Sequence, residues 1–218
     1  MVKSHEVSIE ILPEKTVLKG LLTIPENALE IVVFAHGSGS GRNSPRNQFV
    51  AEYLVKQQLA TLLLDLLTPE EEAVDLHTRE YRFNIPLLAK RLVGTSKALS
   101  RQSNTKNFRV AYFGASTGAA AALIATAEEG NKIAAVVSRG GRPDLAAAVL
   151  SNITAPTLLI VGGDDLEVLE LNREAYALLQ VEKKLEIVPG ASHLFEEHGK
   201  LEEVARLAAA WFKQHLKT

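Results

Sequence analysis

The chain alternates short apolar runs with longer amphipathic stretches. Residues 7–11 alternate apolar and polar positions, and 16–24 form a second strand-like segment, so an antiparallel hairpin at a sheet edge is predicted. The runs that follow are continuously apolar, which is typical of strands buried on both faces of a parallel sheet. They cover residues 31–35, 60–64, 110–113, 133–137, 157–161 and, in a shorter form, 185–188.

Helix-like segments separate these runs, at residues 48–58, 79–99, 117–129, 168–179 and 200–216. This alternation predicts an α/β fold with a mostly parallel sheet of eight strands flanked by helices. The acidic segment 68–78 is predicted to be a solvated surface loop, with a place on the rim of a ligand site as the alternative. About 18 residues separate 137 from 157, enough for one short helix but not for a large cap domain.

Composition narrows the class of protein. With 218 residues, 46% of them hydrophobic and 23% charged, the chain can bury one sizeable core, so a single domain over 1–218 is expected. The absence of cysteine excludes a disulfide scaffold, a cysteine nucleophile and thiolate metal sites. A net charge of −2 gives no sign of a nucleic-acid or membrane-surface partner. Without a long apolar run or a signal-peptide pattern, we expect a cytoplasmic protein with no transmembrane helix.

Residues 114–118 read Gly-Ala-Ser-Thr-Gly, a G-x-S-x-G pattern with Ser116 at its centre. The pattern alone is weak, but here a strand-like run precedes it and a helix-like run follows it. That context is what a nucleophilic serine on a sharp turn between strand and helix needs. The alternative is that Ser116 only caps the following helix.

A nucleophilic serine needs a base, and the base needs an acid that orients it. Asp164 and Asp165 follow the apolar run 157–161, and His193 follows the run 185–188, so all lie where strands end. The order Ser…Asp…His is that of a hydrolase triad. The turn before the two aspartates could present either one, and His198 is the one spatial rival of His193.

The oxyanion of an acyl-transfer reaction needs two backbone donors. Residues 36–39, His-Gly-Ser-Gly, follow a strand and free their loop to point N–H groups inward. We therefore predict the N–H groups of Ser38 and Thr117 as the oxyanion hole. His36 is interpreted as a structural hydrogen-bonding residue of that loop, with a role as base as the alternative.

Taken together, these motifs resemble the α/β-hydrolase superfamily over the whole chain, and more narrowly its dienelactone hydrolase-like branch. The resemblance rests on residues 36–39, 114–118, 162–168 and 190–193. It implies that the acid is Asp165, at the D of G-x-x-D-x-x-V, and that the base is His193, at the H of G-x-x-H. Dienelactone hydrolases use a cysteine nucleophile, whereas this chain has Ser116, so a general carboxylic ester hydrolase is expected rather than one for the cyclic enol-lactone.

Basic side chains follow several strands near this edge of the sheet, where they either pair with acidic neighbours or bind an anionic substrate. Arg46 and Arg139 are the best candidates for substrate binding; the others are Arg42, Arg142, Arg79 and Arg82.

The expected function is a serine hydrolase that cleaves a small-molecule ester without metal or organic cofactor. The alternatives are a peptidase or thioesterase on the same triad, and a catalytically silent binding protein of the same fold. The sequence leaves the oligomeric state open.

Overall fold

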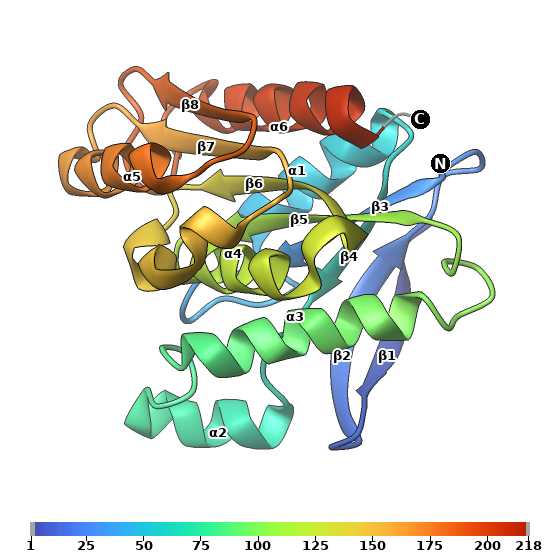
Figure 1. Cartoon of the computed structure of the whole chain (residues 1–218). Helices are drawn as coiled ribbons and strands as arrows, with labels where there is room; N and C mark the ends of the chain where they lie inside the picture. Colours follow the sequence, from blue (N-terminus) through green and yellow to red (C-terminus); the bar gives the residue numbers. More distant parts are fainter. Residues whose placement is uncertain (1–2, 217–218) are drawn as a thin grey trace.

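The computed structural model describes residues 3–216, which form one eight-stranded sheet with helices on both faces (Figure 1). The strands are β1 (His5–Ile11), β2 (Thr16–Thr23), β3 (Glu30–Ala35), β4 (Ala60–Leu64), β5 (Arg109–Ala115), β6 (Ile133–Arg139), β7 (Thr157–Gly162) and β8 (Lys183–Val188). Their spatial order is β1-β2-β4-β3-β5-β6-β7-β8. β1 pairs antiparallel with β2 and β2 with β4, and all remaining pairs are parallel. The predicted hairpin and the mostly parallel eight-stranded sheet are therefore confirmed.

Helices cover the two faces of the sheet unequally. They are α1 (Pro45–Lys56), α2 (Pro69–Thr78), α3 (Ile85–Leu99), α4 (Thr117–Glu129), α5 (Leu166–Leu178) and α6 (Lys200–Leu216), with 3₁₀ helices η1 (Gly130–Lys132) and η2 (Pro143–Asn152). α1 and α6 pack together on one face, while α3, α4, α5 and η2 lie on the other (Figure 1). No separate cap is inserted before β7, as predicted, because the segment there is only the short η2.

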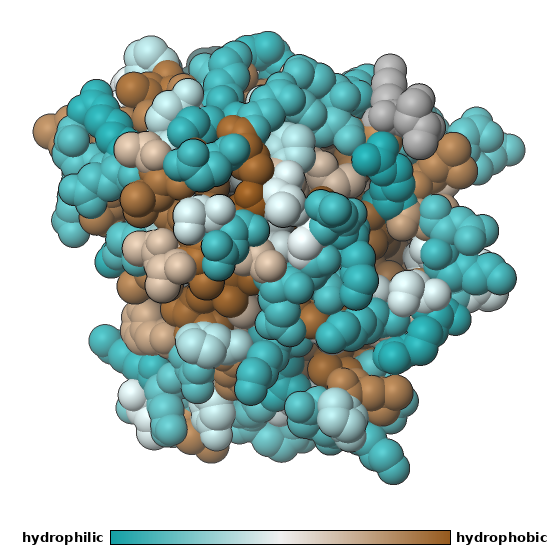
Figure 2. Space-filling view, viewed as in Figure 1, coloured by the Kyte–Doolittle hydropathy of each residue, from teal (hydrophilic) through white to brown (hydrophobic). Residues whose placement is uncertain are grey.

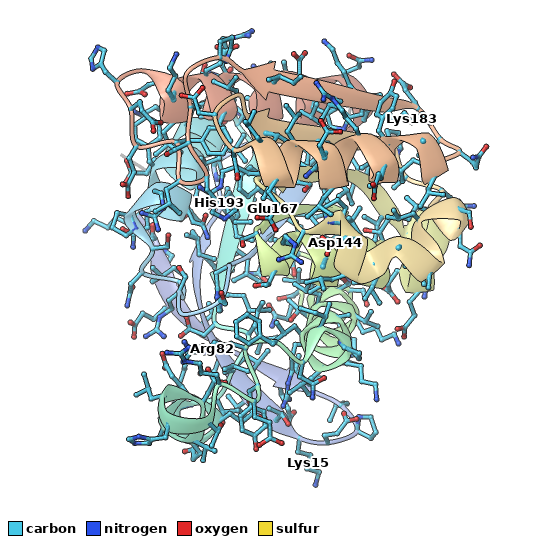
Figure 3. The ribbon with its side chains drawn as sticks, turned by 90° about the vertical axis from the view of Figure 1, so that its left-hand side faces the viewer. Lys15, Arg82, Asp144, Glu167, Lys183 and His193 are labelled. Atoms are coloured by element: carbon cyan, nitrogen blue, oxygen red, sulfur yellow. The ribbon has the colours of Figure 1, made fainter. Side chains whose placement is uncertain are left out.

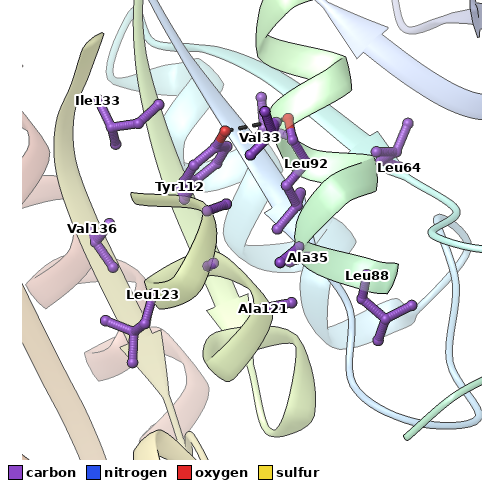
Figure 4. Packing of buried hydrophobic residues seen from close by; sticks show 14 of the residues in the cluster. Val33, Ala35, Leu64, Leu88, Leu92, Tyr112, Ala121, Leu123, Ile133 and Val136 are labelled. Carbon is purple, nitrogen blue, oxygen red and sulfur yellow. Dashed lines mark hydrogen bonds between the residues drawn. The ribbon is translucent and has the colours of Figure 1, made fainter. Parts of the chain in front are cut away.

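The core owes its two layers to the continuous apolar strands. Val33 and Ala35 of β3 face α3 and α4, while Val32 and Phe34 face α1 and α6, and all four are almost fully buried. Figure 4 shows the α3–α4 side, where Tyr112 donates its hydroxyl hydrogen to the carbonyl of Leu92 at 3.2 Å. Its burial raises the pKa of the Tyr112 hydroxyl well above the usual range.

The prediction of a loop at 68–78 is wrong, because residues 69–78 form helix α2. Thr68 accepts the N–H of Glu71 on its side chain, and the Glu71 carboxylate accepts the N–H of Thr68, which is a capping box. Pro69 at the first position and three glutamates in the first turn favour the same start. The charge run therefore marks a helix N-terminus, and Glu71 ties α2 to α3 through Arg91 at 2.6 Å.

The helix predicted at 79–99 begins later, at Ile85. Arg79 has φ +59° and ends α2, and the turn that follows is held by Asp75, which accepts the N–H groups of Tyr81 and Arg82. Asn84 then caps α3 by accepting the N–H of Leu87.

The surface is mostly hydrophilic on the face in Figure 2, with hydrophobic patches towards its left-hand side, over α5 and η2. Leu145 of η2 and Leu166 and Leu178 of α5 are among the large apolar side chains that stay exposed. Between residues 3 and 216, none of the helices combines the length and the apolar composition that crossing a bilayer requires.

The contact between Gly94 of α3 and Ile11 of β1 sets how closely that helix approaches the sheet. A Cβ atom at Gly94 would lie 2.3 Å from Cγ2 of Ile11. We expect Gly94→Ala to lower the free energy of unfolding by about 1–2 kcal/mol through overpacking, despite the better helix propensity of alanine. Urea denaturation measures this.

In an Ile11→Ala background, Gly94→Ala should leave the free energy of unfolding unchanged or raise it by up to about 1 kcal/mol. The overpacking is then absent, and only the higher helix propensity of alanine remains. An equal loss in both backgrounds would show that Ile11 does not set the limit.

Candidate active site

Ser116 lies between β5 and α4, on the turn that the sequence pattern predicts. Its backbone has φ 51° and ψ −122°, a strained conformation for a residue with a side chain. Its N–H donates to the carbonyl of Arg139 at 3.2 Å, and its carbonyl accepts the N–H of Arg142 at 3.2 Å. The side chain makes no capping hydrogen bond to α4, so the alternative that Ser116 only caps the helix does not describe this geometry.

Two glycines make the turn sterically feasible. A Cβ at Gly114 would lie 2.4 Å from Cα of Ala119, and one at Gly118 would lie 2.3 Å from the carbonyl oxygen of Ala35. Both contacts are with backbone, which cannot move aside. The two glycines of the pattern are therefore required for α4 to start directly against β3 and β5.

His193 and Asp165 lie beside Ser116. Nδ1 of His193 donates to Oδ2 of Asp165 at 2.7 Å, and Nε2 lies 3.3 Å from Oγ of Ser116, within hydrogen-bond reach. The Asp165 side chain is 15% exposed and that of His193 is 37% exposed, so the pair is sheltered but open to small molecules. Figure 3 looks onto this edge of the sheet and labels His193 there.

The loops that carry these two residues are held together by backbone contacts. Asp164 donates its N–H to the carbonyl of Ala191 at 3.0 Å, and a Cβ at Gly162 would lie 2.3 Å from the same carbonyl oxygen. Asp164 itself points to solvent and is exposed. The structure thus brings Asp165, and not Asp164, to the histidine.

The other histidines lie elsewhere. His36 is buried at the end of β3, where its Nδ1 donates to the carbonyl of Gly37 at 2.9 Å and its Nε2 accepts the N–H of Leu66 at 3.0 Å. The interpretation of His36 as a structural hydrogen-bonding residue is confirmed. His5, His77 and His198 are exposed, and His215 packs against Trp211 in a tilted arrangement with ring centroids 4.2 Å apart.

The predicted oxyanion donors flank the serine. Thr117 is the first residue of α4, so its N–H has no acceptor within the helix. Ser38 lies in the turn closed by the hydrogen bond from Ser40 N–H to the carbonyl of Gly37 at 3.2 Å. The turn runs close to Ser116, since a Cβ at Gly37 would lie 3.1 Å from that of Ser116.

A cavity of about 200 Å³ opens in front of these groups. Its lining residues come from the turn 37–40, the start of α1, the ends of β5 and β6, and the loop after β8. They are Gly37, Ser38, Ser40, Ser44, Arg46, Asn47, Ala115, Ser116, Arg139, His193 and Leu194.

The predicted arginines divide into paired and unpaired ones. Arg42 is bound to Asp65, Arg142 to Asp144 at 2.7 Å and Arg82 to Asp75 at 2.5 Å. The exposed Arg79 belongs to the turn after α2. None of these four arginines lines the cavity in front of Ser116, although Arg82 lines a neighbouring cavity on the other side of the turn 37–40.

Arg46 and Arg139 both line the cavity beside Ser116. Arg46 donates to the exposed Glu196 at 2.8 Å. Arg139 is only 7% exposed, and its Nε and Nη1 have no hydrogen-bond partner among the described residues. Burial, and then the charge of Arg46, lower the pKa of the Arg139 guanidinium to about 10.

Sequence reasoning missed Asn172, which supports this edge of the sheet. It is fully buried in α5 and donates to the carbonyls of Gly141 at 3.0 Å and Val168 at 2.7 Å. The sequence could have indicated it, because Asn172 lies on the apolar stripe of a helix that also carries Val168 and Leu169. An amide buried in such a stripe must find hydrogen-bond partners.

Comparisons with known proteins agree with this architecture. The family model of the dienelactone hydrolase family matches residues 18–217. A crystal structure of a dienelactone hydrolase from Anabaena variabilis ATCC 29413 is 55% identical, with a TM-score of 0.97 and 99% of each chain covered. An esterase domain of a Rhodothermus marinus protein shares the fold at a TM-score of 0.77, with 18% identity over 99% of this chain and 100% of that one.

Two curated Mycobacterium tuberculosis proteins named "putative phosphoribosyl transferase" are 53% identical over 212 residues. The match covers 97% of this chain but 47% of theirs, so the chain spans about half the length of these relatives.

The burial of His36 has a consequence for stability against pH. Burial lowers the pKa of His36 below its ordinary 6.5, against weaker opposing effects of the Gly37 carbonyl, Asp65 and Glu72. The unfolded chain therefore binds a proton that the folded chain does not, so this contribution to stability is present above pH 6.5 and is lost as the pH falls.

We expect His36→Gln to weaken the loss of stability in urea between pH 7 and pH 5 relative to the wild type. The exposed His77→Gln serves as the control and should leave the pH dependence unchanged. Parallel pH curves for the wild type and His36→Gln would contradict the assignment.

Proposed function

The chain belongs to the dienelactone hydrolase family and is a hydrolase of the α/β type. We propose that it hydrolyses carboxylic esters of small substrates with Ser116, His193 and Asp165 as its catalytic residues. The observation that carries the proposal is the continuous chain of contacts from Asp165 through His193 to Ser116, at 2.7 and 3.3 Å. Nucleophile, base and orienting acid stand in the order that acyl transfer requires.

In the first half of the reaction, Oγ of Ser116 attacks the carbonyl carbon of the ester while Nε2 of His193 takes the hydroxyl proton. The tetrahedral intermediate then expels the alcohol, which receives that proton from His193, and an acyl-enzyme remains. Water attacks the acyl-enzyme in the second half, again with His193 as base, and releases the acid and free Ser116. Asp165 holds the Nδ1–H tautomer and stabilises the imidazolium between these steps.

We assign the oxyanion hole to the N–H groups of Ser38 and Thr117. The position of Thr117 at the start of α4 supports this, because the positive end of the helix faces developing negative charge there. The close approach of Gly37 to Ser116 supports Ser38.

Of the two arginines predicted to contact an anionic substrate, Arg139 is the better supported. Arg46 shares its charge with Glu196, whereas two nitrogens of Arg139 have no partner among residues 3–216. The Arg139 residue lines the cavity, where the charge of an anionic substrate would compensate that of the guanidinium. A cytoplasmic location stays a prediction from the sequence.

The nucleophile is tested by Ser116→Ala, which should lower kcat on an activated aryl ester by a factor on the order of 10⁶. The exposed Ser100→Ala is the matched control and should keep wild-type turnover. A fluorophosphonate probe should label the wild type and not Ser116→Ala. Failure of the probe to label the wild type would favour a silent binding protein, and higher turnover of matched thioesters or amides would favour the other acyl chemistries.

The two neighbouring aspartates offer an internal comparison. Asp165→Asn should lower kcat by a factor on the order of 10⁴, because the amide favours the wrong imidazole tautomer. Asp164→Asn should cost much less, since this side chain points to solvent. A larger loss at Asp164 in steady-state kinetics would reverse the assignment.

A further inference from the structure

The buried guanidinium of Arg139 is the one feature of the cavity that the hydrolytic chemistry leaves unexplained. It lies at the end of β6, next to the strand that carries Ser116, with its guanidinium carbon 5.9 Å from the centroid of the Phe195 ring. A buried charge without a partner costs stability, because its lost hydration is not replaced. Among the described residues the Phe195 ring faces this guanidinium, and a negative group that enters the cavity would compensate its charge.

The charge of the cavity wall is one-sided. Two arginines line it, and no aspartate or glutamate is among its lining residues. The nearest pairing carboxylate, Glu196, reaches Arg46 from outside the cavity and is itself 62% exposed on its side chain. On the other side of the turn 37–40, a second cavity of about 150 Å³ is lined by Glu72, Asp75 and Arg82, and since Arg82 pairs with Asp75 its wall keeps a net negative charge that disfavours an anion.

The start of α1 adds a third source of positive potential. Ser44 caps this 12-residue helix by accepting the N–H of Asn47, and Pro45 brings no N–H, so the N–H of Arg46 is left without an acceptor within the helix. Ser44, Arg46 and Asn47 all line the cavity. The hydroxyls of Ser38, Ser40 and Ser44 line the cavity as well. Donors thus come from three separate elements: the turn after β3, the N-terminus of α1 and the end of β6.

This arrangement suits one chemical class of anion better than another. A carboxylate is planar and satisfied by one arginine from one direction. A phosphate monoester carries close to two charges and three terminal oxygens, and it matches a helix N-terminus and two arginines that converge from different sides. We propose that Arg139, Arg46 and the N-terminus of α1 bind a phosphate group carried by the ester substrate. The inference rests on the proposed esterase function and names its substrate class.

The experiment compares three p-nitrophenyl esters whose acyl chains have equal length and end in a methyl group, a carboxylate or a phosphate monoester. For the wild type, kcat/KM should be roughly 10- to 150-fold higher for the phosphate ester than for the neutral one, the value of one charge-assisted contact. The carboxylate ester should fall between them. Arg139→Met should lower the phosphate-to-neutral ratio severalfold, with Arg46 retaining a smaller preference, while Arg206→Met, which removes an exposed arginine of α6, should leave the ratio unchanged.

Thermal unfolding without substrate checks that Arg139→Met folds and separates binding from structure. Since the substitution removes an unpaired buried charge and keeps an apolar stem, its Tm should equal or exceed that of the wild type. A lower Tm together with an unchanged substrate ratio would make Arg139 a structural residue and overturn the proposal.

A binding measurement keeps this inference distinct from the proposed function. Calorimetric titration of Ser116→Ala with the phosphate and neutral esters reports affinity without turnover, and the phosphate ester should bind at least 10-fold more tightly. Hydrolysis of the neutral ester without any preference for phosphate would overturn this inference alone. Preference for the carboxylate over the phosphate would do the same. Absence of hydrolysis by the wild type would overturn the esterase function, while the titration would still decide the phosphate site.

Discussion

The strained backbone of Ser116 is the constraint on which the rest of the site depends. A residue with a side chain at φ 51° and ψ −122° costs about 1–3 kcal/mol, and it persists only where its surroundings over-determine it. Here the N–H of Ser116 is bonded to Arg139 at the end of β6, and its carbonyl is bonded to Arg142 in the segment that follows. α4 closes the other side, because Gly118 lets it approach the carbonyl of Ala35.

That constraint couples the ends of four strands, β5, β6, β7 and β8, into one surface. The bond from Ser116 to Arg139 fixes the end of β6 against β5, and Gly140, with φ +51°, then passes His193 so closely that a Cβ there would lie 3.2 Å from the His193 carbonyl oxygen. The loop of His193 is joined in turn to that of Asp165 through Ala191. The proposed nucleophile, base and acid are therefore positioned by backbone contacts between loops, and the side chains only complete the geometry.

The sequence predicts the sheet well because burial on both faces leaves continuous apolar runs, such as 31–35 and 157–161, that few other structures produce. It predicts α2 wrongly because the charge run at 70–72 is equally compatible with a solvated loop and a helix start. Only the reciprocal hydrogen bonds of Thr68 and Glu71 distinguish the two. Composition does not reveal such a capping box, although the spacing of Thr68 and Glu71 in the sequence fits one.

Some residues of the candidate site could likewise be predicted from the sequence, and others could not. The strand–turn–helix context singles out Ser116 without any structure, whereas the choice of Asp165 over Asp164 depended on a family pattern, since adjacent residues differ only in where a tight turn points them. Which arginine lacks a partner was beyond sequence reasoning. The partner of Arg46 lies 150 residues away at Glu196, and that of Arg42 lies 23 residues away at Asp65. Pairing at such separations exists only in the folded chain.

His36 and Arg139 are both buried at this edge of the sheet, but their hydrogen bonding differs. Both nitrogens of His36 are occupied, by the carbonyl of Gly37 and the N–H of Leu66, so burial there yields a neutral, rigid support for the turn that carries Ser38. Arg139 is buried to a similar degree, yet two of its donors find no acceptor in the described chain. A buried group whose hydrogen bonds are complete costs the fold little, whereas each buried donor without an acceptor carries a desolvation penalty. At similar burial, this difference leaves His36 as a support of the turn and makes Arg139 the residue of this edge that we propose for binding.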